Sequence, residues 1–96
     1  MYPGLAGKYH AAGMVTTRAI GDELFLMHRD THATYSLNET SSFIWRLCDG
    51  IVTGYDIRDA VVEHYDVTRE ESGRTVAELI DMLVREGLLV RADDHA

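Results

Sequence analysis

The segment LNETSSFIWRLCDG, residues 37–50, is where the chain changes from strand-like to helix-like sequence. Before it, apolar residues tend to alternate with polar ones, which is typical of half-buried strands. After it, they recur every three to four residues, which indicates amphipathic helices. Asn38 is suited to cap a helix, because its side-chain oxygen accepts a hydrogen bond from an unpaired N–H of the first turn.

The helix predicted after Asn38 has one apolar face, made by Phe43, Ile44, Leu47 and Cys48. Gly50 lies where a C-cap glycine is expected to end this helix. Trp45 lies off the apolar face, which leaves two positions open for it: the core between sheet and helices, or a surface that meets a partner. We favour the core, because so small a domain needs its largest side chain buried.

Three segments upstream predict an antiparallel meander: residues 14–19, 23–29 and 32–37, separated by turn signals at Gly21-Asp22 and Asp30-Thr31. The third strand alternates cleanly, with Ala33, Tyr35 and Leu37 on one side and His32, Thr34 and Ser36 on the other. In the order 1-2-3 this strand lies at an edge, with a row of unpaired N–H and C=O groups.

The first thirteen residues hold three glycines and a proline without periodicity. We interpret residues 1–13 as a flexible N-terminal tail, with the alternative that they order against a partner. The folded domain is expected at residues 14–91, followed by a C-terminal tail at 92–96.

Two more helices follow. Thr53 and Asp56 form a capping box before an amphipathic stretch that reaches Tyr65. Thr68 and Glu71 form another, before a third helix that Gly87 is placed to end. The buried stripe of that helix is expected to be Val76, Leu79, Ile80 and Leu83. Leu88-Leu89-Val90 predicts a short closing strand.

Gly73 and Ala77 put two small residues on one stripe of the third helix. They indicate either a groove beside the helix or close packing against another helix, and the pattern leaves both open. Strands followed by helices predict an α+β domain, here a three-stranded antiparallel sheet followed by three helices. These are also the parts of a winged helix-turn-helix.

Composition excludes several classes of protein. The 96 residues are 46% hydrophobic with one proline, as in a small folded domain, and no apolar run is long enough to span a bilayer. The net charge of −7 argues against nucleic acid or an anionic membrane as partner. The lone Cys48 allows no internal disulfide, which favours the cytoplasm, and it is expected to pack as a small hydrophobe. The five histidines lack the spacing of a metal site, so no metal or cofactor is expected.

The central segment also carries a family resemblance. The motifs that carry it are Leu37-Asn38-Glu39-Thr40, Ile44-Trp45, Asp49-Gly50, Tyr65-Asp66-Val67 and Glu86-Gly87-Leu88-Leu89. Together they resemble the PqqD-like proteins, small peptide chaperones named for pyrroloquinoline quinone biosynthesis, whose module is also called the RiPP recognition element, for ribosomally made and post-translationally modified peptides. The resemblance covers residues 8–91, and it departs from the usual pattern at Ser41 and Cys48.

The resemblance implies a winged helix-turn-helix fold and a peptide-binding function without catalysis. The leader of a precursor peptide is expected to add as a strand to the third strand and to lie in a cleft beside the third helix. The partners implied are that leader peptide and a modifying enzyme, either a radical S-adenosylmethionine (SAM) protein or a leader protease. The site residues expected on this basis are His32, Ala33, Thr34, Tyr35 and Ser36 on the strand, and Gly73, Arg74, Ala77, Ile80 and Asp81 on the helix.

A DNA-binding winged helix is the main alternative, because a fold does not fix a function. The third predicted helix of this chain carries three arginines but five carboxylates between Arg69 and Glu86, which disfavours phosphate binding. An independent enzyme is the weaker alternative, since no acid–base or nucleophile constellation appears in the sequence.

Overall fold

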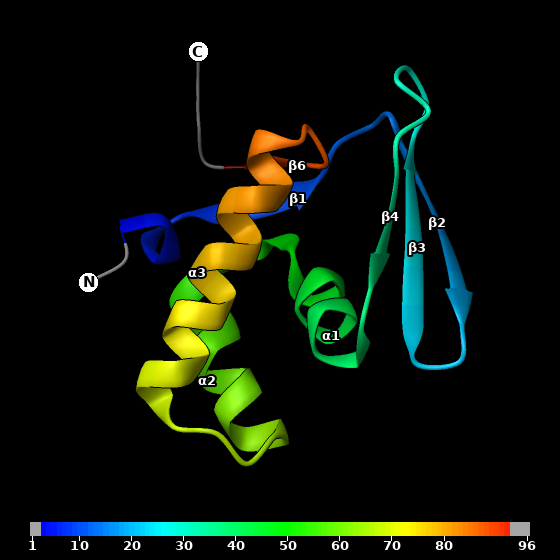
Figure 1. Cartoon of the computed structure of the whole chain (residues 1–96). Coiled ribbons are helices and arrows are strands. Elements are labelled where there is room, and N and C mark those ends of the chain that lie inside the picture. Colours follow the sequence, from blue (N-terminus) through cyan, green and yellow to red (C-terminus); the bar gives the residue numbers. More distant parts are fainter. Residues whose placement is uncertain (1–2, 93–96) are drawn as a thin grey trace.

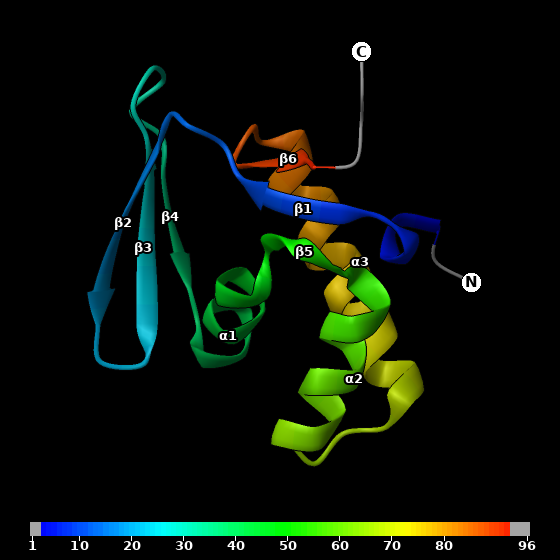
Figure 2. The same ribbon diagram turned by 180° about the vertical axis from the view of Figure 1, so that it is seen from behind.

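The computed structural model of the protein describes residues 3–92, and in this range the chain is an α+β domain. Its helices are η1 (Pro3–Ala6, 3-10), α1 (Glu39–Leu47), α2 (Gly54–His64) and α3 (Arg69–Arg85). Its strands are β1 (Lys8–Ala11), β2 (Val15–Ile20), β3 (Glu23–His28), β4 (Thr34–Leu37), β5 (Asp49–Thr53) and β6 (Leu89–Arg91). The sheet β2-β3-β4 lies at one end of the molecule, α2 and α3 lie at the other, and α1 lies between them (Figures 1 and 2).

The predicted meander is confirmed. Strand β3 pairs antiparallel with both β2 and β4, so β4 is an edge strand of this sheet. The inner face of the sheet presents Leu24, Leu26 and Leu37, each no more than 5% exposed. Ser42 of α1 joins this helix to the sheet, because its hydroxyl donates to the Leu37 carbonyl and accepts from the N–H of Leu24.

The predicted caps begin all three helices. The Asn38 side chain accepts from the N–H of Ser41 at 2.8 Å, and both capping boxes, at Thr53 and at Thr68, are present. Helix α3 ends in a Schellman motif: the N–H of Leu88 donates to the Leu83 carbonyl, and Gly87 has a φ of 77°. The local sequence therefore determines where each helix begins and where the longest one ends.

Gly50 is not the C-cap of α1, which corrects the prediction. That helix ends at Cys48, and Gly50, with a φ of 83°, lies in strand β5. Strand β5 was not predicted, and it forms a second three-stranded sheet with β1 and β6 in the order β5-β1-β6. The connection from α1 to α2 is therefore a strand and not a turn.

The prediction of a flexible tail at residues 1–13 is wrong for residues 3–11. They form η1 and β1, and Tyr9 pairs with Arg91 at the other end of the chain. Leu5 and Tyr9 belong to the core, at 2% and 6% exposed, so the domain begins well before Met14. Residues 1–2 and 93–96, which complete the two predicted tails, lie outside the described residues.

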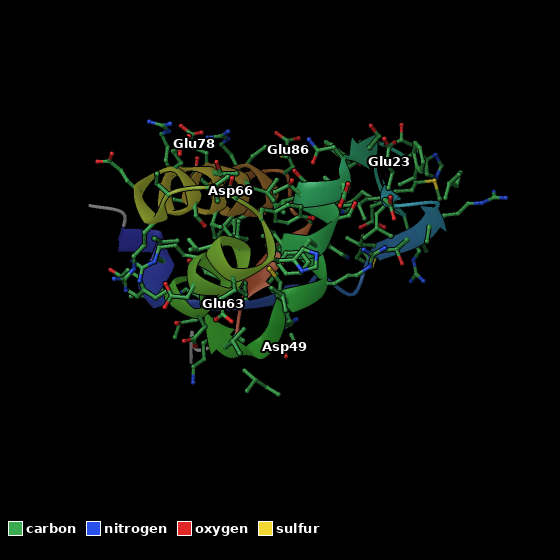
Figure 3. The ribbon with its side chains drawn as sticks, turned by 90° about the horizontal axis from the view of Figure 1, so that it is seen from below. Glu23, Asp49, Glu63, Asp66, Glu78 and Glu86 are labelled. Carbon is green, nitrogen blue, oxygen red and sulfur yellow. The ribbon has the colours of Figure 1, made fainter. Side chains whose placement is uncertain are left out.

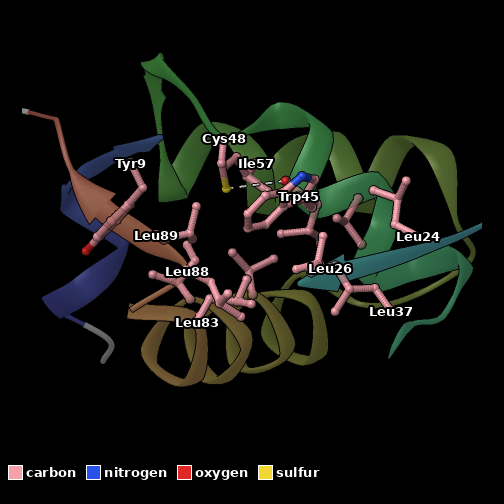
Figure 4. Packing of buried hydrophobic residues seen from close by; sticks show 14 of the residues in the cluster. Tyr9, Leu24, Leu26, Leu37, Trp45, Cys48, Ile57, Leu83, Leu88 and Leu89 are labelled. Carbon is pink, nitrogen blue, oxygen red and sulfur yellow. Dashed lines mark hydrogen bonds between the residues drawn. The ribbon is translucent and has the colours of Figure 1, made fainter. Parts of the chain in front are cut away.

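The main core lies where the β2-β3-β4 sheet, α1, α2, α3 and β6 meet (Figure 4). Ile44, Ile57, Val76 and Leu83 are at most 1% exposed, and Trp45 is 8% exposed, so the core position favoured for the indole is confirmed. Helices α2 and α3 are tied by the buried Ser72 hydroxyl, which donates to the Arg58 carbonyl at 2.8 Å. In residues 3–92 no helix is long and apolar enough to cross a membrane.

We expect Gly54→Ala to lower the free energy of unfolding by about 1–3 kcal/mol, because it overpacks the joint between α2 and η1. A Cβ at Gly54 would lie 2.6 Å from the Cα and 2.8 Å from the carbonyl oxygen of Leu5, and backbone atoms cannot rotate aside. Gly13→Ala is the matched control, since a Cβ there meets nothing within 4 Å. Urea unfolding measures both, and equal midpoints for the two variants would contradict the packing described here.

Candidate functional site

The open edge of β4 is defined by the direction of its backbone groups. The N–H of His28 in β3 donates to the Ala33 carbonyl at 3.0 Å, and the register pairs Met27 with Thr34. In an antiparallel ladder, groups on alternate residues point toward and away from the partner strand. Thr34 and Ser36 therefore direct their N–H and C=O groups away from β3, toward the open edge.

One side-chain hydrogen bond shows which face of α3 lies nearest to β4. The Tyr35 hydroxyl donates to Oε1 of Glu86, just beyond the end of α3, at 2.8 Å. The hydrogen bond to the Glu86 carboxylate raises the pKa of the Tyr35 phenol above its ordinary value. Strand β4 and the C-terminal end of α3 are thus linked directly.

Helical periodicity extends this face along α3. Leu79, Met82 and Glu86 are spaced i, i+3 and i+7, so they share one side of the helix. Leu79 and Met82 are half-buried against the core, as is Tyr35 on β4. We call Tyr35, Leu79, Met82 and Glu86, with the edge of β4, the β4–α3 surface. It combines unpaired main-chain groups with a partly exposed apolar strip, which is what a bound extended peptide requires.

The predicted third strand is shorter in the structure by two residues at its start. Strand β4 begins at Thr34, so His32 and Ala33 precede it. His32 has a φ of 63° and its N–H donates to the His28 carbonyl, which closes the turn. The carbonyl of Ala33 already serves the pairing with β3, and only Thr34, Tyr35 and Ser36 lie in the strand.

Two helix residues of the predicted site are core residues. Ile80 is 3% exposed. Gly73 is buried between α3, α2 and η1: a Cβ there would lie 3.4 Å from Cδ of Arg58 and 3.8 Å from Cδ1 of Leu5. Of the two interpretations that the sequence left open for Gly73, the structure supports close packing and not a groove.

The other three predicted helix residues lie away from β4. Arg74 is exposed, and position 77 lies about 200° around the helix from Leu79. Ala77 and Asp81 border a separate open hollow of about 830 Å³. We call it the β6–α3 hollow; its walls include Tyr9, Ala77, Val84 and Val90. Ala77 and Asp81 therefore border a surface on the opposite flank of α3 from the one that faces β4.

Sequence reasoning missed Met82 and Glu86 and assigned Leu79 only to the buried stripe. Their spacing beside that stripe was visible, but either flank of an amphipathic helix fits such a pattern equally well. The choice depends on where β4 lies, and that is set by contacts between residues far apart in the chain, such as Tyr35 and Glu86.

Residues 3–92 hold neither an exposed thiol nor a cluster of metal ligands. Cys48 is buried, its thiol donates to the Ile44 carbonyl, and burial raises its pKa to about 12, so it packs as a neutral group. Among residues 3–92, no three His, Cys, Asp or Glu side chains come together as metal ligands.

The described chain is thus a small α+β domain that sets an open strand edge beside the flank of a long helix. A sequence model described as "Coenzyme PQQ synthesis protein D (PqqD)" matches residues 23–89. The protein belongs to the PqqD family. A separate comparison with curated proteins finds no match to the chain.

Two solved structures are similar over most of the chain. TbiB1, in complex with the TbiA(beta) leader peptide, has a TM-score of 0.78 and 26% identity, and the match covers 91% of this chain and 98% of that one. Lasso peptide synthetase B1, complexed with the leader peptide, has a TM-score of 0.77 and 21% identity, and covers 86% and 98%. The second likeness concerns the fold alone.

Proposed function

We propose that this protein binds the leader of a ribosomally made precursor peptide at the β4–α3 surface and presents the peptide to a modifying enzyme. The observation that carries the proposal is the open edge of β4, whose Thr34 and Ser36 main-chain groups face away from β3 beside the apolar flank of α3. The PqqD family and the leader peptide bound by TbiB1 support it.

The binding mode is strand addition. Main-chain hydrogen bonds from the leader to Thr34 and Ser36 supply affinity, and Leu79 and Met82 on α3 receive its apolar side chains. The protein performs no chemistry itself. It raises the local concentration of the core peptide near the enzyme. That enzyme is a radical SAM maturase or a leader protease, and the exchange takes place in the cytoplasm.

The acidic helix does not favour the DNA-binding alternative. Exposed carboxylates at Glu70, Glu78 and Asp81 lie on the solvent side of α3, where they would repel phosphate. Glu78 and Glu86 both project from α3 on the side away from α2 (Figure 3).

We expect Met82→Ala to weaken leader binding by about tenfold, through the loss of apolar contact on the β4-facing flank. Val84→Ala is the matched control, because Val84 is 41% exposed on the opposite flank. The measurement is titration of a fluorescent leader peptide, with amide shifts followed by NMR. Equal losses for both variants, or shifts that spare β4 and residues 79–86, would place the leader elsewhere.

A further inference from the structure

The β6–α3 hollow is a largely apolar surface outside the proposed leader site. Its α3 wall presents Ala77 and Val84, and the facing walls present Tyr9 of β1 and Val90 of β6. Val84 and Val90 are 41% and 40% exposed, so two aliphatic side chains stand open to solvent on facing elements. A protein surface of this shape is suited to receive an apolar segment of a partner.

Charge on the rim narrows the kind of partner. Glu78 and Asp81 line the α3 side of the hollow, and the chain as a whole carries a net charge of −7. Arg91 lies on the other side, next to Tyr9 and Gly7. Asp81 pairs with Arg85 at 2.7 Å. Glu78 is therefore the lining carboxylate best placed to bind a positively charged side chain of a partner. The Glu78 carboxylate would complement a lysine or arginine on the segment that enters the hollow.

The hollow and the β4–α3 surface are separated by the helix itself. Ala77 and Leu79 point about 200° apart around α3, so a peptide on one flank leaves the other uncovered. A module that presents a bound peptide must hold the peptide and contact the enzyme at the same time. Two surfaces on opposite flanks of one rigid helix satisfy that requirement.

We propose that the β6–α3 hollow is the docking site for the modifying enzyme, which inserts an apolar segment carrying lysine or arginine between α3 and β6. This proposal rests on the proposed function for the identity of the partner. It assigns the two flanks of α3 different tasks: the β4 side binds the substrate, and the β6 side binds the enzyme.

The test uses the full chain with two probes: the precursor peptide and the modifying enzyme identified from the coding sequences next to its own. Val84→Glu and Val90→Glu put a carboxylate into the apolar walls, and each is expected to weaken enzyme binding by about tenfold or more. Leader affinity is expected to stay within about twofold of wild type for both, which also shows that they fold. Glu78→Lys should weaken enzyme binding most at low salt, where a lost charge contact counts most.

The matched control is Val67→Glu, since Val67 is a valine of similar exposure, 37%, that does not line the hollow. It should leave enzyme binding unchanged. The proposal is overturned if the wild type does not bind the enzyme, or if Val84→Glu binds it as tightly as wild type. It is also overturned if sedimentation shows a dimer of this chain that Val84→Glu dissociates, because the occupant is then a second copy. A Thr34→Pro variant, which alters the open edge of β4, separates the two proposals. If it binds the leader as tightly as wild type while the enzyme docks as expected, the proposed leader site is wrong and the docking site stands.

Discussion

Thr34→Pro is expected to weaken leader binding by about 100-fold or more while the protein stays folded. The substitution removes the N–H of Thr34, which points to the open edge, and places a ring where the added strand would pair. It does not break the ladder with β3, because the main-chain groups that point toward β3 belong to the alternate residues, Ala33 and Tyr35, and not to Thr34. Thr34 is also the first residue of its strand, a position where proline is tolerated.

Two companion variants separate the main-chain effect from others. Thr34→Ala keeps the N–H and removes only an exposed side chain, so leader affinity should stay within about threefold of wild type. Tyr35→Pro should instead destabilise the sheet, because the N–H of Tyr35 points toward β3. Circular dichroism checks folding, and peptide titration gives the affinity. If folded Thr34→Pro binds a cognate leader as tightly as wild type, strand addition at β4 is wrong.

The β4 edge could be predicted from sequence because its signals are local. Residues 34–37 alternate, turn residues precede them, and Asn38 follows with the first helix. Each feature acts over a few residues, so no long-range contact is needed to find it. The start of the strand was misplaced by two residues, because His32 adopts a φ of 63° that closes the turn.

The N-terminal segment could not be predicted, because its structure comes from distant partners. Lys8 pairs with Thr53 and Tyr9 with Arg91, and neither pairing leaves a periodic pattern in residues 1–13. Glycines in that segment lower local propensity further, yet Gly7 serves the fold through the contact of its carbonyl with the N–H of Gly54. Tertiary pairing overrides local preference here.

The helix half of the site shows the limit of periodicity. The pattern of α3 gives the buried stripe well: Val76, Ile80 and Leu83 are at most 3% exposed. A stripe has two flanks, and nothing along the helix says which one meets β4. The Tyr35–Glu86 hydrogen bond decides it, and it joins residues 51 positions apart.

Trp45→Ala is expected to lower the free energy of unfolding by about 3–5 kcal/mol, because it leaves a cavity in the core. Trp45 is 8% exposed on α1, the helix that lies between the sheet and the helical pair. A loss of this size is a large share of the stability of a domain of 96 residues. Urea or thermal unfolding should therefore show a much lower midpoint than wild type.

Phe43→Ala is the comparison that makes the Trp45 result specific, and it should cost less, about 1–3 kcal/mol. Phe43 lies on the same helix but is only half-buried, stacked on His64 with ring centroids 4.6 Å apart and edge-on to Tyr65 at 5.5 Å. Its removal loosens the contact between α1 and the end of α2 without opening the centre of the core. If the two variants unfold at the same midpoint, or Trp45→Ala unfolds like wild type, the indole does not hold the sheet and the helices together, and its place is at an interface instead.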